Sequence, residues 1–231
     1  MSLYQSKFFF TSKIDGNLAF HVNDNKEKVI QNHKKLAKKH GYNLDNLIHM
    51  KQIHSNKVHI VNEQNNFSNP PTCDALITDK KNTPLMVMVA DCTPVLFFDH
   101  IKGVIAAVHI GRQGAFKNIV KNVLESFTNN YGSKKENIKV YIGASICKNC
   151  YEVGAEIVKE ADYLNLDYAV ERKNTKFYLD VNKIIFKQLK EHGIDKKNVE
   201  LSPECSSCDQ KYYSYRRDGQ TGRFAGVIEL V

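Results

Sequence analysis

Apolar residues recur along the chain with two different periods, which separate strands from helices. Residues 85–89, 95–98 and 104–109 are almost entirely apolar and rich in β-branched side chains. Such runs are typical of strands that are covered on both faces of a sheet. Elsewhere, apolar side chains repeat at intervals of three and four residues, which predicts helices over residues 24–40, 115–131, 153–163 and 181–192.

Shorter β-rich runs extend the predicted sheet to residues 7–10, 58–61, 75–78, 138–142, 199–201 and 224–230. Asn23 or Asp24 can cap the first helix, and Gly41 ends it. Strands and helices mix throughout, with no repeat and no Pro/Gly/Ser-rich linker. The sequence therefore predicts one domain over residues 1–231, of the α/β or α+β class, with helices flanking a mixed central sheet. The pattern leaves the strand order open.

The charge of the chain does little to change this prediction of its fold. The chain has 231 residues and a formal net charge of +8, from 33 Lys and Arg against 25 Asp and Glu. Lysine pairs on a solvated surface are the favoured interpretation. A positive field that attracts phosphate or nucleotides is the alternative. Nucleic acid is disfavoured as a partner, because no helix-turn-helix or RNA-binding signature accompanies the charge.

The distribution of apolar residues favours a cytoplasmic protein without a membrane span. The first residues offer only a three-residue aromatic run, whereas a secretory signal needs a longer apolar stretch. The most apolar window, residues 84–98, is interrupted by Asp91 and is too short to cross a bilayer. In a reducing cytosol, the six cysteines are expected to be metal ligands, nucleophiles or buried thiols rather than disulfides.

Three residues at predicted strand ends are candidates for chemistry. Cys92 lies between two apolar strands, where Pro94 is expected to break or bulge the sheet. His109 ends a third strand and precedes a glycine turn, so it should face the same crevice if these strands pair. His54 precedes another short strand. Taken singly, each has a plainer interpretation: a buried thiol, a core histidine and a surface histidine.

Together, these three residues allow two chemistries. In one, His109 activates Cys92 as a nucleophile. In the other, His54, Cys92 and His109 hold zinc and leave a fourth position open, as catalytic zinc sites do. Because the three residues are far apart in the sequence, their spacing leaves both possibilities open.

Two further cysteine pairs form a competing pattern. Cys147 and Cys150 make one C-x-x-C motif, and Cys205 and Cys208 make another. Two such pairs suggest a four-thiolate zinc site, but positions 150 and 205 are 55 apart, which is longer than the usual spacing. A structural zinc site is therefore disfavoured, and an unpaired Cys73 is expected to be inert.

The C-terminal stretch 212–223 places three tyrosines beside three arginines and two glycines. One interpretation is an exposed hairpin that turns at Asp218 and Gly219. The other is a loop that holds an anion or an aromatic base, because arginine grips phosphate and tyrosine stacks on rings. The pattern favours neither.

Seven ordered segments resemble one known family, the multicopper polyphenol oxidases (laccases), also described as zinc-dependent purine nucleoside phosphorylases. The resemblance runs from about residue 51 to residue 231. The segments are QIH (52–54), DALIT (74–78), ADCTP (90–94), AAVH (106–109), CYEVG (150–154), CSSC (205–208) and YSYRRDGQTGR (213–223). The resemblance implies a fold like that of cysteine hydrolases and a catalytic metal held by His54, Cys92 and His109. It places the C-x-x-C motifs outside this metal triad.

The resemblance also implies an activity: phosphate-dependent cleavage of purine nucleosides such as adenosine and inosine, with adenosine deamination as a second reaction. Zinc is favoured over copper, since nine histidines without a His-x-His pair provide no multicopper array. Cys92, His109 and the neighbouring Asp91 are the candidate catalytic residues, with Asp91 as orienter or proton carrier. The candidate binding residues for phosphate are Arg112, Arg216, Arg217 and Arg223.

The sequence departs from the family pattern at two places. The family usually has HAGWRG where this chain has HIGRQG (109–114), and adjacent cysteines where the first is displaced to Cys147. Both differences concern substrate preference more than metal binding.

Three rival functions remain open. One is an amidase acting on cell-wall precursors, with Cys92 and His109 as nucleophile and base. The others are a copper-dependent polyphenol oxidase and a basic binding module without activity.

Overall fold

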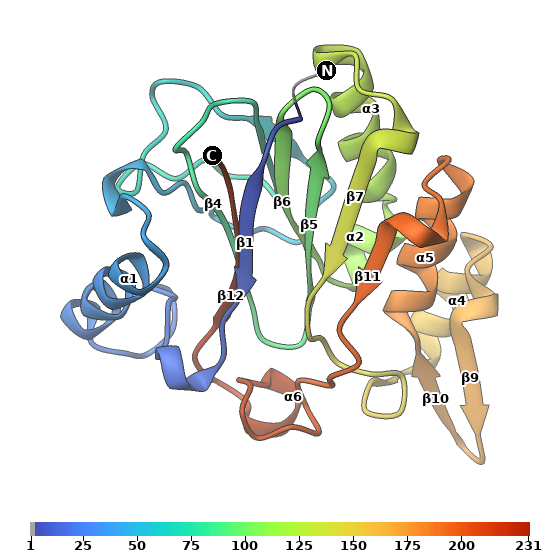
Figure 1. Ribbon diagram of the computed structural model, residues 1–231. Helices are drawn as coiled ribbons and strands as arrows, with labels where there is room; N and C mark the ends of the chain where they lie inside the picture. Colours follow the sequence, from blue (N-terminus) through green and yellow to red (C-terminus); the bar gives the residue numbers. More distant parts are fainter. Residues whose placement is uncertain (1–2) are drawn as a thin grey trace.

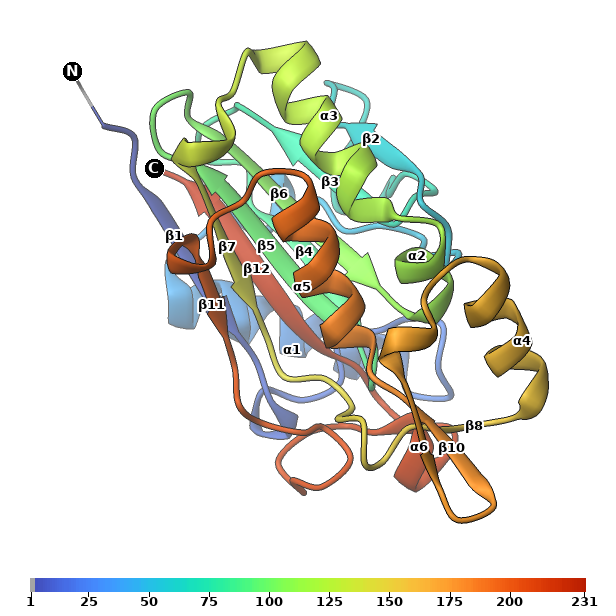
Figure 2. The same ribbon diagram turned by 90° about the vertical axis from the view of Figure 1, so that its right-hand side faces the viewer.

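Two β-sheets stack face to face, and helices cover their outer faces (Figures 1 and 2). The computed structural model of the chain describes residues 3–231. The larger sheet has the order β11-β7-β5-β6-β3-β2 and is mixed, because β11 runs parallel to β7 and β2 parallel to β3. Its strands are β2 (Val58–Ile60), β3 (Ala75–Thr78), β5 (Thr93–Asp99), β6 (Val104–Ile110), β7 (Ile138–Ile142) and β11 (Val199–Leu201).

The smaller sheet is antiparallel and joins the two ends of the chain. Its order is β1-β12-β4, with β1 (Ser6–Phe10), β12 (Phe224–Leu230) and β4 (Leu85–Val89). A third, peripheral sheet has the order β8-β10-β9, with β8 (Glu152–Val153), β9 (Val170–Lys173) and β10 (Lys176–Leu179).

Helices lie on both outer sides of the stacked sheets, and the short α6 (Tyr215–Asp218) lies beyond one end of them (Figure 1). The others are α1 (Lys26–His40), α2 (Arg112–Phe116), α3 (Ile119–Tyr131), α4 (Ala155–Tyr163) and α5 (Val181–Glu191). Single 3₁₀ turns occur at Lys13–Asp15, Leu44–Asn46, Lys135–Asn137, Asp167–Ala169 and Lys196–Asn198.

Three apolar layers hold the structure together. Between the sheets, side chains such as Val87 and Ile228 pack against Leu96 and Ala107. The outer face of the larger sheet is covered by α3 and α5, and that of the smaller sheet by α1. Strands of both sheets are thus buried on both faces, which explains their nearly continuous apolar sequences. The predicted class, one α/β domain with a mixed sheet and flanking helices, is confirmed.

Two helix predictions need correction. Asn25 caps α1 in place of Asn23 or Asp24, because its side chain accepts the backbone N–H groups of Glu27 and Lys28. The helix predicted over residues 115–131 is two helices, α2 and α3. Asn118 separates them with a left-handed backbone (φ 52°), and its side chain caps α3.

The prediction that the sheet breaks or bulges at Pro94 is also wrong. Pro94 lies inside β5, opposite His109. The chain reverses earlier, over residues 90–92, where it crosses from the smaller sheet to the larger one, and Asp91 has a positive φ of 84°. Pro94 is tolerated because it is only the second residue of its strand. This crossing places Cys92 at the edge where the two sheets diverge.

Among the helices of the described residues, none combines the length and the apolar character that crossing a membrane requires.

Candidate active site

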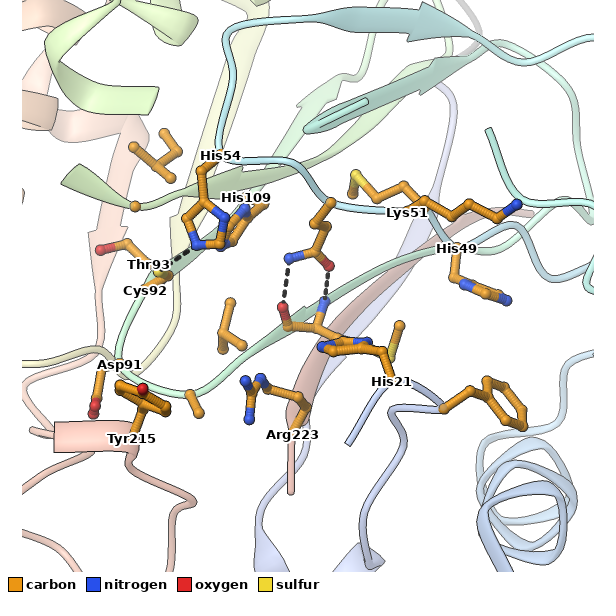
Figure 3. Close-up of a pocket in the computed structure, with 18 of the residues that line it drawn as sticks. His21, His49, Lys51, His54, Asp91, Cys92, Thr93, His109, Tyr215 and Arg223 are labelled. Atoms are coloured by element: carbon orange, nitrogen blue, oxygen red, sulfur yellow. Dashed lines mark hydrogen bonds between the residues drawn. The ribbon is translucent and has the colours of Figure 1, made fainter. Parts of the chain in front are cut away.

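Three side chains from distant parts of the sequence meet at one end of the larger sheet. Cys92 comes from the crossing between β4 and β5, His109 from β6, and His54 from the loop before β2. Their ligand atoms all lie within 4.8 Å of one another, and Nε2 of His54 is 4.0 Å from Sγ of Cys92 (Figure 3). The structure therefore brings together the three residues that the sequence singled out.

Strand pairing explains this meeting. β5 and β6 are antiparallel neighbours with Thr93 opposite Ile110, so the residue before β5 lies beside the end of β6. His109 is almost fully buried there, whereas Cys92 is half-buried and His54 exposed. A left-handed backbone at His54 (φ 57°) turns its ring toward the other two. A non-glycine residue in this conformation is uncommon and indicates a constrained site.

Asp74 organises the site, a role that was not predicted from the sequence. Its carboxylate is fully buried and accepts backbone N–H groups from residues 53, 54 and 55. It also accepts the hydroxyl of Ser55 at 2.7 Å and bonds Nδ1 of His109 at 2.8 Å. One side chain thus fixes both the loop of His54 and the ring of His109. Because Asp74 engages Nδ1, Nε2 is the nitrogen of His109 left to face Cys92. The only sign of it in the sequence was an acidic residue directly before an apolar run, at a position where charged residues are uncommon.

The proton affinities of Cys92, His109 and Asp74 are linked. Burial alone would raise the pKa of Cys92, but His109 and His54 lower it to about 6. Burial would lower the pKa of His109, but Cys92 and Asp74 raise it to about 9. Burial would raise the pKa of Asp74, but hydrogen bonds from His109 and Ser55 lower it to about 2. The contacts therefore favour a thiolate at Cys92 beside a protonated His109, the ion pair that nucleophilic attack uses. A metal ion needs the same thiolate, and its binding at Nε2 of His109 would displace the proton there.

Gly111 leaves room for these groups. A Cβ atom at this position would lie 2.9 Å from Sγ of Cys92 and 3.2 Å from Cδ2 of His54. Its φ of −85° is available to any residue, so the requirement for glycine here is one of space.

The three residues open into a cavity of about 980 Å³. One part of its wall is apolar or aromatic and includes Phe20, Met50, Phe67 and Met88. Histidines 21 and 49 also line it (Figure 3). Gln52 is fixed in its wall by two hydrogen bonds to the backbone of Met88. Apolar walls with a few placed polar groups are typical of small-molecule sites.

The four candidate arginines divide into two kinds. Arg112, Arg216 and Arg223 line the cavity, and Figure 3 shows Arg223 beside it. Arg112 also pairs with Glu160, and Arg216 donates to the carbonyl of Glu152. Arg217 is placed elsewhere: its guanidinium donates to the carbonyls of Ser206, Ser207, Asp209 and Tyr212 and pairs with Asp218. It therefore folds the C-terminal loop and is no longer a candidate for phosphate binding.

Asp91 lines the cavity, but its carboxylate is engaged in structure. One oxygen accepts the hydroxyl of Ser206 at 2.7 Å, and the other accepts the backbone N–H of Arg216 at 2.6 Å. It thus tethers α6 to the turn that carries Cys92. The hairpin at Asp218 and Gly219, one of the two interpretations of this stretch, is wrong: these residues end and follow this short helix, with Ser214 as its cap.

The comparisons with known proteins identify the family. Residues 10–231 match the family described as multi-copper polyphenol oxidoreductase laccase. The chain belongs to this family. A relative from Corynebacterium glutamicum, named a purine nucleoside phosphorylase, is 36% identical over 93% of this chain and 86% of its own length. A purine nucleoside phosphorylase from Clostridium acetobutylicum is 34% identical over 95% of this chain and 90% of its own.

Solved structures of the family show the same fold. The hypothetical protein YfiH from Bacillus licheniformis has a TM-score of 0.93 and 26% identity, covering 100% of this chain and 97% of that one. The Neisseria meningitidis protein NMB0706 has a TM-score of 0.85 and 28% identity, covering 97% and 94%. The family resemblance inferred from seven sequence segments is thereby confirmed.

The laccase-family chain also contains a second set of potential metal ligands. The sulfur atoms of Cys147, Cys150, Cys205 and Cys208 all lie within 4.8 Å of one another. The sequence analysis disfavoured this arrangement because of the long spacing. That interpretation is wrong in its geometry, because pairing between residues 145 and 205 brings the two motifs together.

Proposed function

We propose that the chain is a zinc-dependent purine nucleoside phosphorylase, which cleaves nucleosides such as adenosine and inosine with inorganic phosphate. The observation that carries this proposal is the juxtaposition of a His54–Cys92–His109 cluster with a cavity large enough for a nucleoside. Several relatives over more than 90% of the chain are named for this activity. Six free cysteines suit a reducing compartment, so the cytoplasm is the proposed location.

The donor set fits zinc. Two imidazoles and one thiolate are the ligand types that Zn²⁺ prefers, and three protein ligands are the usual number at catalytic zinc. Asp74 bound to Nδ1 of His109 is the kind of partner that fixes the ring of a metal-bound histidine. Bound there, zinc would leave one coordination position open toward the cavity and polarise an atom placed in it.

The surrounding residues suit the two substrates of phosphorolysis. In this reaction the bond from C1′ of the ribose to the purine nitrogen breaks, its electron pair leaves with the purine, and a phosphate oxygen bonds C1′. Arg112, Arg216 and Arg223 supply positive charge for the phosphate, since guanidinium groups bind its oxygens in pairs. The aromatic walls at Phe20 and Phe67 suit the flat faces of a purine. Asp91 acts as a positioning residue through its tether to α6.

Adenosine deamination is included in the proposal as a second reaction of the same site. Purine deaminases place an open zinc position next to the ring carbon that loses its amine. The cluster of His54, Cys92 and His109 at the end of an aromatic-walled cavity supports that arrangement. Release of ammonia from adenosine without added phosphate tests it, and phosphorolysis of inosine in the same preparation serves as the comparison.

An amidase is the second candidate, because Asp74, His109 and Cys92 are connected in the order of a carboxylate–imidazole–thiol triad. Metal dependence separates the two candidates. A thiol hydrolase retains activity after chelation, whereas the proposed phosphorylase loses activity and regains it with zinc. Stoichiometric copper with phenol oxidation would instead support the polyphenol oxidase.

The test of the proposal is incubation of the purified protein with inosine and phosphate, followed by measurement of hypoxanthine and ribose 1-phosphate. Equal amounts of both products are expected, with none when phosphate is omitted. His54→Gln should remove the activity. His59→Gln is the matched control, because His59 lies in β2 and bonds Asn65 away from the cavity. Absence of both products from zinc-loaded protein would overturn the proposal.

A further inference from the structure

The four-cysteine cluster lies apart from the His54–Cys92–His109 site and plays no part in the proposed phosphorolysis. Cys147, Cys150 and Cys205 are half-buried, and Cys208 is exposed. All four are free thiols, and the pair of sulfurs at Cys150 and Cys208 is 3.3 Å apart, far beyond the covalent S–S distance of about 2.0 Å. These four thiols, which lie close together and reach the surface, are therefore a candidate binding site.

The dimensions of the cluster fit a tetrahedral metal. Zinc–sulfur bonds of about 2.3 Å place the four sulfurs of a tetrahedral site about 3.8 Å apart. All four sulfurs here lie within 4.8 Å of one another, which is close to that spacing. Four protein ligands would close the site, which is the arrangement of structural rather than catalytic zinc. The partial exposure gives a metal ion a route of entry.

The backbone around Cys205 suits a thiolate rather than a thiol. Residues 147–150 form a tight turn, with the N–H of Cys150 bonded to the carbonyl of Cys147 at 3.0 Å. The N–H of Cys147 points at Sγ of Cys205, 3.2 Å away. A backbone N–H aimed at sulfur favours the charged form, which is the form that binds metal.

Positive charge also lies close to the second motif. The guanidinium of Arg217 donates to the carbonyls of Ser206 and Ser207, the two residues between Cys205 and Cys208. A zinc ion with four thiolates has a net charge of −2, which this neighbouring cation offsets only in part, because Asp218 also pairs with Arg217. Arg217 therefore belongs to the surroundings of the four-cysteine cluster rather than to the phosphate-binding residues.

The two motifs are attached to the cavity wall. The N–H of Ser206 bonds the carbonyl of Ser145, and its hydroxyl bonds Asp91, the neighbour of Cys92. On the other side, Tyr151 directly follows Cys150 and lines the cavity, with Arg216 stacked 5.2 Å from its ring. Joining the motifs therefore also fixes two residues of the wall.

We propose that Cys147, Cys150, Cys205 and Cys208 bind a second zinc ion, which fastens segment 145–151 to the C-terminal loop and so stiffens this wall of the cavity. The ion has no open position and takes no part in bond breaking. Its loss should loosen residues around 145–151 and 205–217 while the β-sheets remain folded.

The experiment compares zinc bound per chain in protein purified without chelator. The wild type is expected to bind about two, and Cys92→Ser about one. X-ray absorption of the Cys92→Ser protein should then show four sulfur ligands at about 2.3 Å and no imidazole. The double variant Cys150→Ser, Cys208→Ser should also bind about one, with mixed nitrogen and sulfur ligands. Cys73→Ala, which alters the cysteine outside both clusters, should keep both.

Spectroscopy on Cys92→Ser keeps the test decisive even if the double variant fails to fold. Zinc-free Cys92→Ser protein, or nitrogen ligands on its remaining zinc, would overturn the proposal. So would a Cys150–Cys208 disulfide in freshly purified, unoxidised wild type. A single four-sulfur zinc in both wild type and Cys92→Ser would support this site while contradicting the proposed catalytic one, so the two claims fail separately.

Discussion

Oδ1 of the buried Asp74 lies 2.8 Å from Nδ1 of His109, and the same carboxylate accepts the backbone N–H of His54. Two candidate zinc ligands from different elements are therefore oriented by one acid. This relationship makes the site a consequence of the fold, because Asp74 directly precedes β3, the strand that pairs with β6.

Asp74→Asn tests this role. An amide can replace the shape of the carboxylate but not its charge or its capacity to accept from every donor around it. We expect zinc affinity or turnover to fall about 10- to 100-fold. Zinc titration and steady-state kinetics measure this, with Asp79→Asn at an exposed neighbouring position as the control. If zinc affinity and turnover are unchanged in Asp74→Asn, the carboxylate of Asp74 is not what orients the ring of His109.

Gly111→Ala tests the space around the ligands. The added methyl group would lie 2.9 Å from Sγ of Cys92, so that sulfur must move. Zinc affinity is expected to fall at least about tenfold, while the free energy of unfolding changes by less than about 1 kcal/mol. Gly154→Ala is a matched control: Gly154 also precedes a helix, at φ −80°, and its Cβ would meet only the flexible end of Glu156. Equal effects of both substitutions would contradict this account.

The arginines should separate by function. Arg223→Gln removes a cation from the cavity wall and should raise the KM for phosphate at least about tenfold. Arg217→Gln should raise that KM less than Arg223→Gln does. It should reduce the free energy of unfolding by about 2 kcal/mol, because several backbone carbonyls lose their hydrogen-bond donor. Denaturant unfolding and phosphate titration, applied to both variants, measure the difference. The reverse pattern would restore Arg217 as a binding residue.

His33 should make stability depend on pH. It is fully buried between Phe20 and Phe67, and burial lowers its pKa to about 4, despite a hydrogen bond with the carbonyl of Leu18. Protonation therefore favours the unfolded chain, whose histidine has a pKa of about 6.5. The stabilisation is complete above pH 6.5 and is lost as pH falls toward 4, by about 2 kcal/mol between pH 7 and pH 5.

The matched comparison for this prediction is His33→Phe. Denaturant unfolding at pH 7, 6 and 5 should show a smaller loss of stability on acidification in the variant than in the wild type. Parallel losses in the two proteins would mean that His33 does not titrate during unfolding.

Much of the fold was predictable from periodicity. The β-branched runs of β4, β5 and β6 are unbroken because both of their faces are covered, and α1, α3 and α5 have clear apolar stripes. The hairpin of β9 and β10 was missed, because each strand has only four residues and β9 mixes Glu, Arg and Lys with a single apolar side chain. The stacking of two sheets was also beyond the sequence, since buried strands look alike whichever sheet they join.

The candidate site was predictable where residue type alone restricts the chemistry. His54, Cys92 and His109 are metal-ligand types at strand ends, and the fold brings them together. Asp74 was missed because its role depends on backbone N–H groups that a sequence does not display. The four-cysteine cluster was misjudged because spacing along the chain says little about distance once residues 145 and 205 pair.

The most direct test of the central claim is phosphate-dependent hypoxanthine release from inosine by zinc-loaded Cys92→Ser protein, measured beside wild type and Cys205→Ser. Serine replaces a thiolate ligand of the proposed catalytic zinc, so activity should fall at least about 1000-fold with a folded chain. Cys205→Ser should retain measurable turnover, because it alters only the cavity wall. If Cys92→Ser keeps wild-type activity while Cys205→Ser loses it, the catalytic site is not at His54, Cys92 and His109.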